Sequence, residues 1–151
     1  MFLIENIEQF NINDIFFCDP IKNNIITQGN FIRILYSNNL FILNGIYLYV
    51  YLHNIIVEKY FNKYRCIFDL EIHKELLESI ICIEKGILKK ANIPKKNPIY
   101  KINELICNGN IKFFSDNMEK INNGFLLKIS GIWEDEKNYG VTYKFTPINH
   151  L

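Results

Sequence analysis

The residues best suited to chemistry in this sequence form an aromatic row between Ile46 and His53, where aliphatic and aromatic residues alternate without a break. Successive side chains of a β-strand point to opposite faces, so a strand here has one aliphatic and one aromatic face. The aromatic face carries Tyr47, Tyr49, Tyr51 and His53. Unpaired bases stack on such rings in proteins that bind single-stranded nucleic acid. The alternative is a strand buried on both sides, with the tyrosines packed beneath a helix or a second sheet.

Basic side chains that can contact a phosphate backbone lie on other predicted strands. Arg33 and Arg65 are the only arginines, and they lie on neighbouring predicted strands. A planar guanidinium both pairs with phosphate and stacks on a base. Exposed charges at a sheet edge explain them equally well. Lys112, Lys128 and Lys144 alternate with apolar residues, so they are predicted to line the solvent face of three strands. There they either follow a phosphate backbone or merely solvate the sheet.

Two further aromatic residues, Trp133 and Tyr139, bracket the last predicted hairpin. They either stack on a base or pair with each other across the two strands. The structural pair is the favoured interpretation, and Trp133 is kept as a candidate for base stacking.

The sequence lacks the patterns of an enzyme. Its histidines are isolated, its serines lie in no nucleophile elbow, and it has no phosphate loop or dinucleotide fingerprint. The four cysteines are too widely spaced for a zinc site. The strand-like context of Cys66 and the helical apolar context of Cys82 favour free, buried thiols. The acidic cluster Glu134 to Glu136 is better explained as a solvated hairpin tip than as a divalent-metal site. We therefore expect a binding protein without catalytic residues, metal or cofactor.

Composition and charge limit the fold and the partners. A chain of 151 residues with 49% hydrophobic and 22% charged residues is expected to form one folded domain. The formal net charge of +1 argues against coating of duplex DNA, whereas a single-strand binder needs only a local basic groove. No apolar run reaches the roughly 20 residues of a membrane span, and the first residues lack the basic start of a signal peptide. The protein is therefore predicted to be soluble and intracellular, without a membrane partner.

Periodicity predicts the elements that position these residues. An amphipathic helix is expected within Leu70 to Asn92, where apolar residues recur at helical spacing. Alternation and turn signals predict strands over residues 25–36, 40–56, 60–70, 111–115, 125–133 and 139–145. The last two should form a hairpin. The fold is thus predicted to be mainly β, with residues 1–24 as an N-terminal extension and residues 25–151 as the domain.

Three strands, a helix and further strands follow the order of the OB-fold, a five-stranded Greek-key barrel. That fold binds oligonucleotides around its second and third strands, and the tyrosine row lies on the predicted second strand. We therefore predict an OB-fold-like barrel of five to six strands, with the helix between strands 3 and 4.

Four segments of the chain resemble virus-encoded OB-fold single-stranded DNA-binding proteins, those of large DNA viruses and some phages. The segments are Ile34–Ser37, Leu43–Leu48, Leu127–Glu134 and Tyr139–Phe145. The resemblance covers residues 25–145 and implies a protein that coats exposed single strands of DNA, or of RNA, in replication or recombination. It also implies replication or recombination proteins as partners, in the host cytoplasm, the nucleus or a viral replication site. The chain differs in ending without a long acidic tail.

A second hypothesis belongs to another class, a structural or adaptor subunit of a viral assembly. The aromatic face would then be a protein interface. The uneven charge also bears on partners, because the residues before Pro20 are acidic and the run from Lys85 to Lys101 is basic. We expect the acidic segment to fold over a basic surface of its own chain or to contact a second copy in a homodimer.

Overall fold

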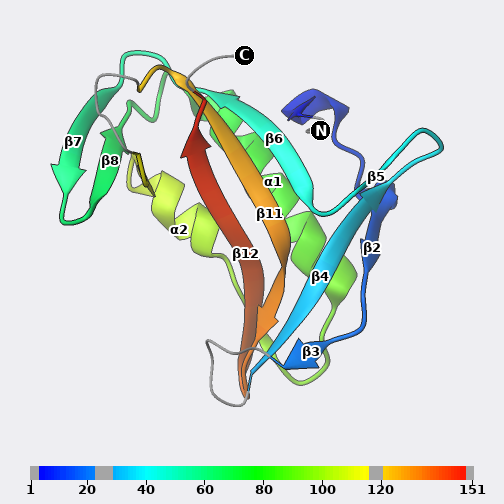
Figure 1. Ribbon diagram of the computed structural model, residues 1–151. Coiled ribbons are helices and arrows are strands. Elements are labelled where there is room, and N and C mark those ends of the chain that lie inside the picture. The colour runs from blue at the N-terminus through cyan, green and yellow to red at the C-terminus, as the bar shows by residue number, and fades with distance from the viewer. Residues whose placement is uncertain (1–3, 23–28, 116–120, 149–151) are drawn as a thin grey trace.

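The computed structural model describes residues 4–22, 29–115 and 121–148. The fold is mainly β, as predicted, with two helices on one side of the larger of two sheets. Figure 1 shows the long strands in front and the helices behind them. The predicted boundary between residues 24 and 25 lies outside the described residues, as does the start of the first predicted strand.

The larger sheet is built around β11 (Gly124–Glu134). On one side β11 pairs antiparallel with β12 (Asn138–Pro147), which confirms the predicted hairpin. On the other side β6 (Ile46–Tyr51) pairs with the first half of β11, and β4 (Asn30–Ser37) pairs with the second half. The short strands at the edges are β1 (Glu5–Asn6), β2 (Ile15–Phe17), β3 (Ile21–Lys22), β5 (Ile42–Leu43) and β9 (Asn97–Ile99). Of these, β1 pairs with β6, β9 pairs with β12, and the other three pair with β4.

The predicted third strand does not join this sheet. Its residues form β8 (Lys63–Ile67), and the residues just before it form an unpredicted strand, β7 (Ile56–Tyr60). The two pair as a hairpin around Phe61, whose φ is 53°. The other edge of β8 pairs with β10 (Asn110–Phe113). Both edges of β8 are therefore used within a separate three-stranded sheet, so the larger sheet stays open and the prediction of a closed barrel is wrong.

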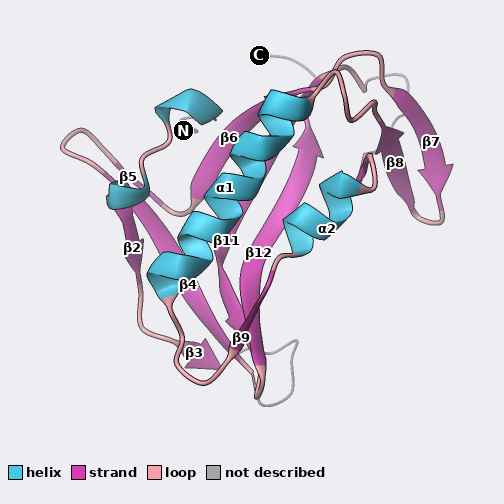
Figure 2. Ribbon diagram, turned by 180° about the vertical axis from the view of Figure 1, so that it is seen from behind, coloured by secondary structure: helices cyan, strands magenta, loops and turns pink. Residues whose placement is uncertain are grey.

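The predicted helix is confirmed as α1 (Lys74–Ala91), which ends at Asn92 with φ 42°. A second helix, α2 (Lys101–Cys107), was not predicted. Both helices cover the back of the larger sheet (Figure 2). Neither is long and apolar enough to cross a membrane, and the described part of the chain contains no other candidate span.

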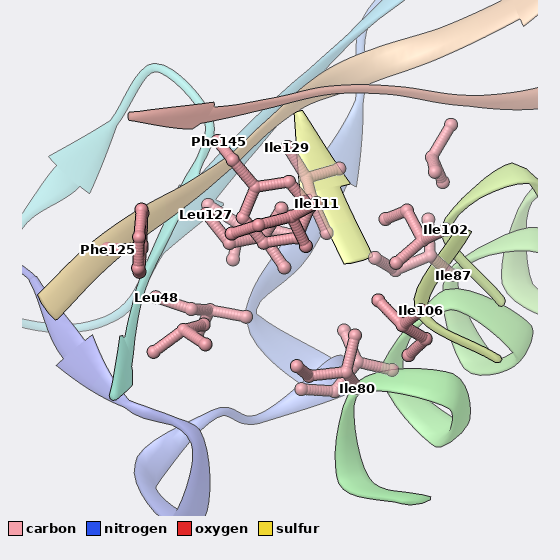
Figure 3. Close-up of a cluster of buried hydrophobic side chains, with 14 of the residues drawn as sticks. Leu48, Ile80, Ile87, Ile102, Ile106, Ile111, Phe125, Leu127, Ile129 and Phe145 are labelled. Carbon is pink, nitrogen blue, oxygen red and sulfur yellow. The ribbon is translucent and has the colours of Figure 1, made fainter. Parts of the chain in front are cut away.

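The core lies between the larger sheet and the two helices. The aliphatic side of β6 is at most 2% exposed from Ile46 to Val50, as the alternation predicts. Figure 3 shows Leu48 with Phe125, Leu127 and Ile129 of β11 on one side of this core. Facing them are Ile80 and Ile87 of α1 and Ile102 and Ile106 of α2. The helices thus occupy one face of the sheet and leave the opposite face free of them.

The N-terminal segment folds against its own chain. The ring of Phe10 stacks on Tyr36 of β4, with ring centroids 5.7 Å apart and planes 9° apart. The Nζ of Lys90, in the basic run, donates to the carbonyl oxygens of Ile12 and Ile15 at 2.8 and 2.9 Å. The segment therefore contacts the basic run through backbone carbonyls, at the C-terminal end of α1.

A buried carboxylate joins the two helices. Glu84 of α1 is 1% exposed and accepts hydrogen bonds from the backbone N–H groups of Ile102 and Asn103, both at 2.9 Å. These donors belong to the first turn of α2, where no intrahelical partner exists. Burial raises the pKa of Glu84, although the two hydrogen bonds oppose the shift. The short helix α2 therefore depends on a residue of α1 for its start.

We expect Glu84→Leu to lower the free energy of unfolding by about 2 to 4 kcal/mol, because two buried donors lose their acceptor. Glu84→Gln should cost less and should also change the pH dependence. Because the folded-state pKa lies above the unfolded one, wild-type stability should fall as pH rises through the window between them. Urea denaturation at several pH values between about 4 and 8 should show a flatter profile for Glu84→Gln. Identical profiles for the two proteins would exclude this role.

Candidate nucleic-acid interface

One broad face of the larger sheet is not covered by α1 or α2 (Figure 2). In Figure 1 it is the side toward the viewer, and we call it the front face. Its side chains are those of the long strands that point away from the helices. They are Phe31, Arg33 and Leu35 of β4, Tyr47, Tyr49 and Tyr51 of β6, Leu126, Lys128 and Trp133 of β11, and Thr142, Lys144 and Thr146 of β12. None of them is acidic.

The predicted tyrosine row lies on this face. Tyr47 and Tyr49 are half-buried, and Tyr51 is 44% exposed. Neither α1 nor α2 covers this face of the sheet (Figure 2), although the first turn of α1 and the 3₁₀ helix Ile7–Gln9 share an open cavity with Tyr49 and Tyr51. The alternative expectation, a strand buried on both sides, therefore does not describe β6.

A row of cations crosses the sheet beside Tyr47. Lys128 of β11 lies directly opposite Tyr47 on one neighbouring strand and opposite Lys144 on the other. The Nζ of Lys128 is 5.4 Å from the centroid of the Tyr47 ring. A cation over a ring face at this distance is attracted to it. The register thus places one ring and two ammonium groups side by side across three strands.

Arg33 reaches the same row through Asn44. Its Nη1 donates to Oδ1 of Asn44 at 2.7 Å, and the Tyr47 hydroxyl donates to the Asn44 carbonyl oxygen at 3.4 Å. The guanidinium carbon is also 5.7 Å from the centroid of the Phe31 ring. The predicted candidates Arg33, Tyr47, Lys128 and Lys144 are therefore brought together, and we call the three cations the cationic row.

A β-bulge brings Trp133 to the front face. The register of β11 and β12 shifts between Ile129 and Gly131, which inserts one extra residue into β11. Trp133 consequently lies opposite Phe31 and Gly140, whereas Tyr139 lies opposite Glu134 and points to the core, where it is 5% exposed. The predicted pair of Trp133 with Tyr139 does not form, because the two rings lie on opposite faces.

Three rings of the front face lie against glycines of a neighbouring strand. A Cβ atom added to Gly140 would come within 2.8 Å of the Trp133 ring. At Gly124 the same atom would meet the Tyr49 side chain at 3.1 Å. Phe31 lies over Gly131 in the same way. A ring that packs on the backbone of a glycine lies flat against the sheet. Its other face then points away from the sheet, where a base can stack on it.

The hairpin tip is ordered by its acids. Glu134 is 8% exposed, accepts from Asn30 Nδ2 at 2.8 Å and forms an ion pair with Lys96 at 3.2 Å. Backbone N–H groups of Lys137 and Asn138 lower the pKa of Asp135. Glu134 is therefore a paired, buried group, which corrects the expectation of a solvated tip for this residue, whereas Asp135 is partly exposed and Glu136 is exposed. The described residues contain no group of three His, Cys, Asp or Glu that is placed to hold a metal ion.

The edge of the front face beyond β6 has the opposite charge. An open cavity of about 770 Å³ lies there, lined by Tyr49 and Tyr51 together with the three acids Glu8, Glu71 and Glu75 and one base, Lys74. His53, the last member of the predicted row, also lines it, with its ring centroid 4.8 Å from that of Tyr51. Phosphates are therefore repelled at this edge and attracted toward β11 and β12.

Two other candidates, Arg65 and Lys112, lie on the three-stranded sheet. They face each other across β8 and β10, and both contact the ring of Tyr60, at 5.1 and 4.5 Å from its centroid. Arg65 is also ion-paired with Glu58. The expectation that Arg33 and Arg65 lie on neighbouring strands is wrong, because β8 does not join the larger sheet.

Three useful residues were not predicted as site residues, namely Phe31, Asn44 and Tyr60. Phe31 stands two residues before Arg33 on one strand, so the period of two places both on one face. That signal was available in the sequence. The contacts of Asn44 and Tyr60 depend on strand register, which the sequence pattern does not supply.

The four cysteines are free, as predicted. Cys66 is buried, and burial raises its pKa to about 12. Cys82 is exposed, which corrects the expectation of a buried thiol there, and Cys107 is exposed as well. The prediction for Cys82 was wrong because the apolar stripe of α1 is narrower than the sequence suggests.

The front face combines rings that can stack with cations that have no acidic neighbour among its side chains, and both features serve single-strand binding. Its geometry and charge are therefore the basis for a functional proposal. Comparisons of the chain with protein-family models, with curated proteins and with solved structures find no match.

Proposed function

We propose that the protein binds single-stranded DNA on its front face with little sequence preference. The observation that carries the proposal is the cross-strand row of Tyr47, Lys128 and Lys144, extended by Arg33, on a face whose long strands point no carboxylate outward. Bases stack on the rings, and the phosphates pair with the cationic row. Stacking tolerates any base because every base has a π-face, so little sequence preference follows.

The proposal extends to a role in coating exposed strands during replication or recombination, as in the virus-encoded OB-fold proteins that the sequence resembles. Two features support this relationship. The chain order of long strands, α1 and a closing hairpin is similar, and the tyrosine row lies on the second long strand. Single-stranded RNA is a similar ligand, because its bases can stack on the same rings and its phosphates can pair with the same cations. The 2′-hydroxyl is the group that distinguishes RNA from DNA.

Removing the central ring tests the stacking role. We expect Tyr47→Leu to weaken binding of labelled oligo(dT) by about 5- to 150-fold, since one stacked ring contributes about 1 to 3 kcal/mol. Tyr47→Phe, which keeps the ring, should bind within about twofold of wild type. Fluorescence anisotropy at two salt concentrations measures both. Equal affinities for Tyr47→Leu and Tyr47→Phe would show that the ring carries no base.

The salt dependence supplies an independent check. If each cation of the row neutralises one phosphate, a short oligonucleotide that spans only the row should give a plot of log K against log salt with a slope of about −2, at about −0.7 per contact for single strands. A slope near zero would contradict phosphate pairing.

A second function, a structural or adaptor subunit of an assembly, has one specific observation in its favour. Leu40 and Ile42, beside the turn between β4 and β5, are 89% and 72% exposed. Exposed apolar side chains of this size occur at protein interfaces. An apolar interface would persist at high salt, whereas binding to phosphates weakens steeply, so the same salt series separates the two functions.

A further inference from the structure

A second cavity, which is basic, lies at the edge of the larger sheet, between β12 and the three-stranded sheet. Its volume is about 560 Å³. Lys63, Lys112 and Lys144 line it together with Phe114 and Tyr143, and we call it the β12 groove. None of its lining residues is acidic.

Two of the three lysines of the β12 groove lie over aromatic rings. The Nζ of Lys63 is 4.9 Å from the centroid of Phe114, and the Nζ of Lys112 is 4.5 Å from that of Tyr60. None of the three lysines forms an ion pair with a carboxylate in the described part of the chain. Three like charges around one cavity repel each other, so an anion bound among them is favoured.

The groove also offers a surface for stacking. Phe114 is 53% exposed although it is a large apolar residue at the end of β10. An exposed ring beside ammonium groups matches both parts of a nucleotide, because the base stacks on the ring while the phosphate pairs with the cations. A simple inorganic anion would use only the second of these.

The groove is continuous with the front face through Lys144, which lines the groove and also lies opposite Lys128 in the cationic row. The outer edge of β12 is open there, because β9 pairs only with the residues from Asn138 to Gly140. The opposite edge of the front face is acidic, so a strand that stacks on the tyrosines is drawn toward β12.

We propose that the β12 groove binds a nucleotide unit, a phosphate with its base, of the strand that crosses the front face. This inference rests on the proposed function. The same chemistry is presented by a free nucleotide, so the experiment includes both sources. Lys63 and Lys112 serve the groove alone, which allows it to be tested separately from the front face.

The test compares wild type with the double variant Lys63→Gln/Lys112→Gln, using labelled oligo(dT) from about 4 to about 16 nucleotides. The matched control is Lys85→Gln/Lys89→Gln, which removes the same charge from exposed positions of α1 behind the sheet. Short oligonucleotides should bind all three proteins equally. With long ones, the groove variant should lose about 1.4 from the magnitude of its salt slope, about 0.7 for each lost contact. Circular dichroism and thermal melting confirm that the variants fold.

Each outcome decides the matter. The groove is overturned as a distinct site if the salt slope of the groove variant equals that of wild type at every length. It is also overturned if the slope falls by the same amount at every length, or by the same amount as in the control variant. If wild type binds no oligonucleotide, the proposed function fails, and calorimetric titration with thymidine triphosphate then tests the groove alone. Binding lost in the groove variant but kept in Lys128→Gln would identify a free-nucleotide site. If wild type does not bind thymidine triphosphate either, the groove is overturned as a free-nucleotide site too.

Discussion

Replacing Lys128 with Glu is expected to weaken oligo(dT) binding about 100-fold at low salt. Lys128 lies at the centre of the cationic row, opposite both Tyr47 and Lys144. The substitution removes one phosphate contact and places a carboxylate where the strand must pass, and like charges brought together cost about 3 kcal/mol. Fluorescence anisotropy against wild type gives the ratio of dissociation constants.

The control for Lys128→Glu is Lys89→Glu, on the exposed side of α1 behind the sheet. Both substitutions change the net charge by the same amount, so a general loss of attraction would affect them equally. A specific front face predicts that Lys89→Glu binds within about threefold of wild type. Equal losses would show that overall charge, and not the cationic row, governs binding. Both variants should melt close to wild type, because surface substitutions cost little.

Local patterns predicted the elements whose side chains alternate or recur without interruption. The period of two between Ile46 and His53 correctly separated a buried aliphatic side from a partly exposed aromatic side on β6. The helical spacing after Leu70 correctly located α1. In both cases one face of the element is buried along its whole length, so the sequence itself records the burial.

Features that depend on pairing between distant strands were not predictable. The bulge in β11 reverses the alternation after Ile129, so Trp133 reaches the front face although a regular strand would turn it inward. The turn at Phe61 uses a residue that rarely adopts a positive φ, which hid the hairpin that keeps β8 out of the larger sheet. Helix α2 begins on the carboxylate of Glu84, a contact supplied by another element.

Gly131→Ala is expected to destabilise the protein by about 3 kcal/mol, at the upper end of the usual cost of overpacking. A Cβ atom at this position would lie 2.3 Å from the carbonyl oxygen of Ile32 and 2.5 Å from the Phe31 ring. The ring can turn, but the carbonyl belongs to the backbone of β4. Relief therefore requires β4 to move away from β11, and the pairing of Gly131 with Arg33 is lost. Urea denaturation measures the change.

Gly86→Ala in α1 is the matched control for this substitution, with the opposite expected sign. The nearest atom to its added Cβ is Cδ1 of Ile12 at 3.6 Å, an ordinary contact. Because Ala favours the helix over Gly, Gly86→Ala should stabilise the protein by about 0.5 to 1 kcal/mol. If Gly131→Ala is as stable as wild type, the β-bulge does not lie at this position of β11. A destabilised Gly131→Ala would show that the position of Arg33 in the cationic row depends on this glycine, because the two residues lie directly opposite each other on β4 and β11.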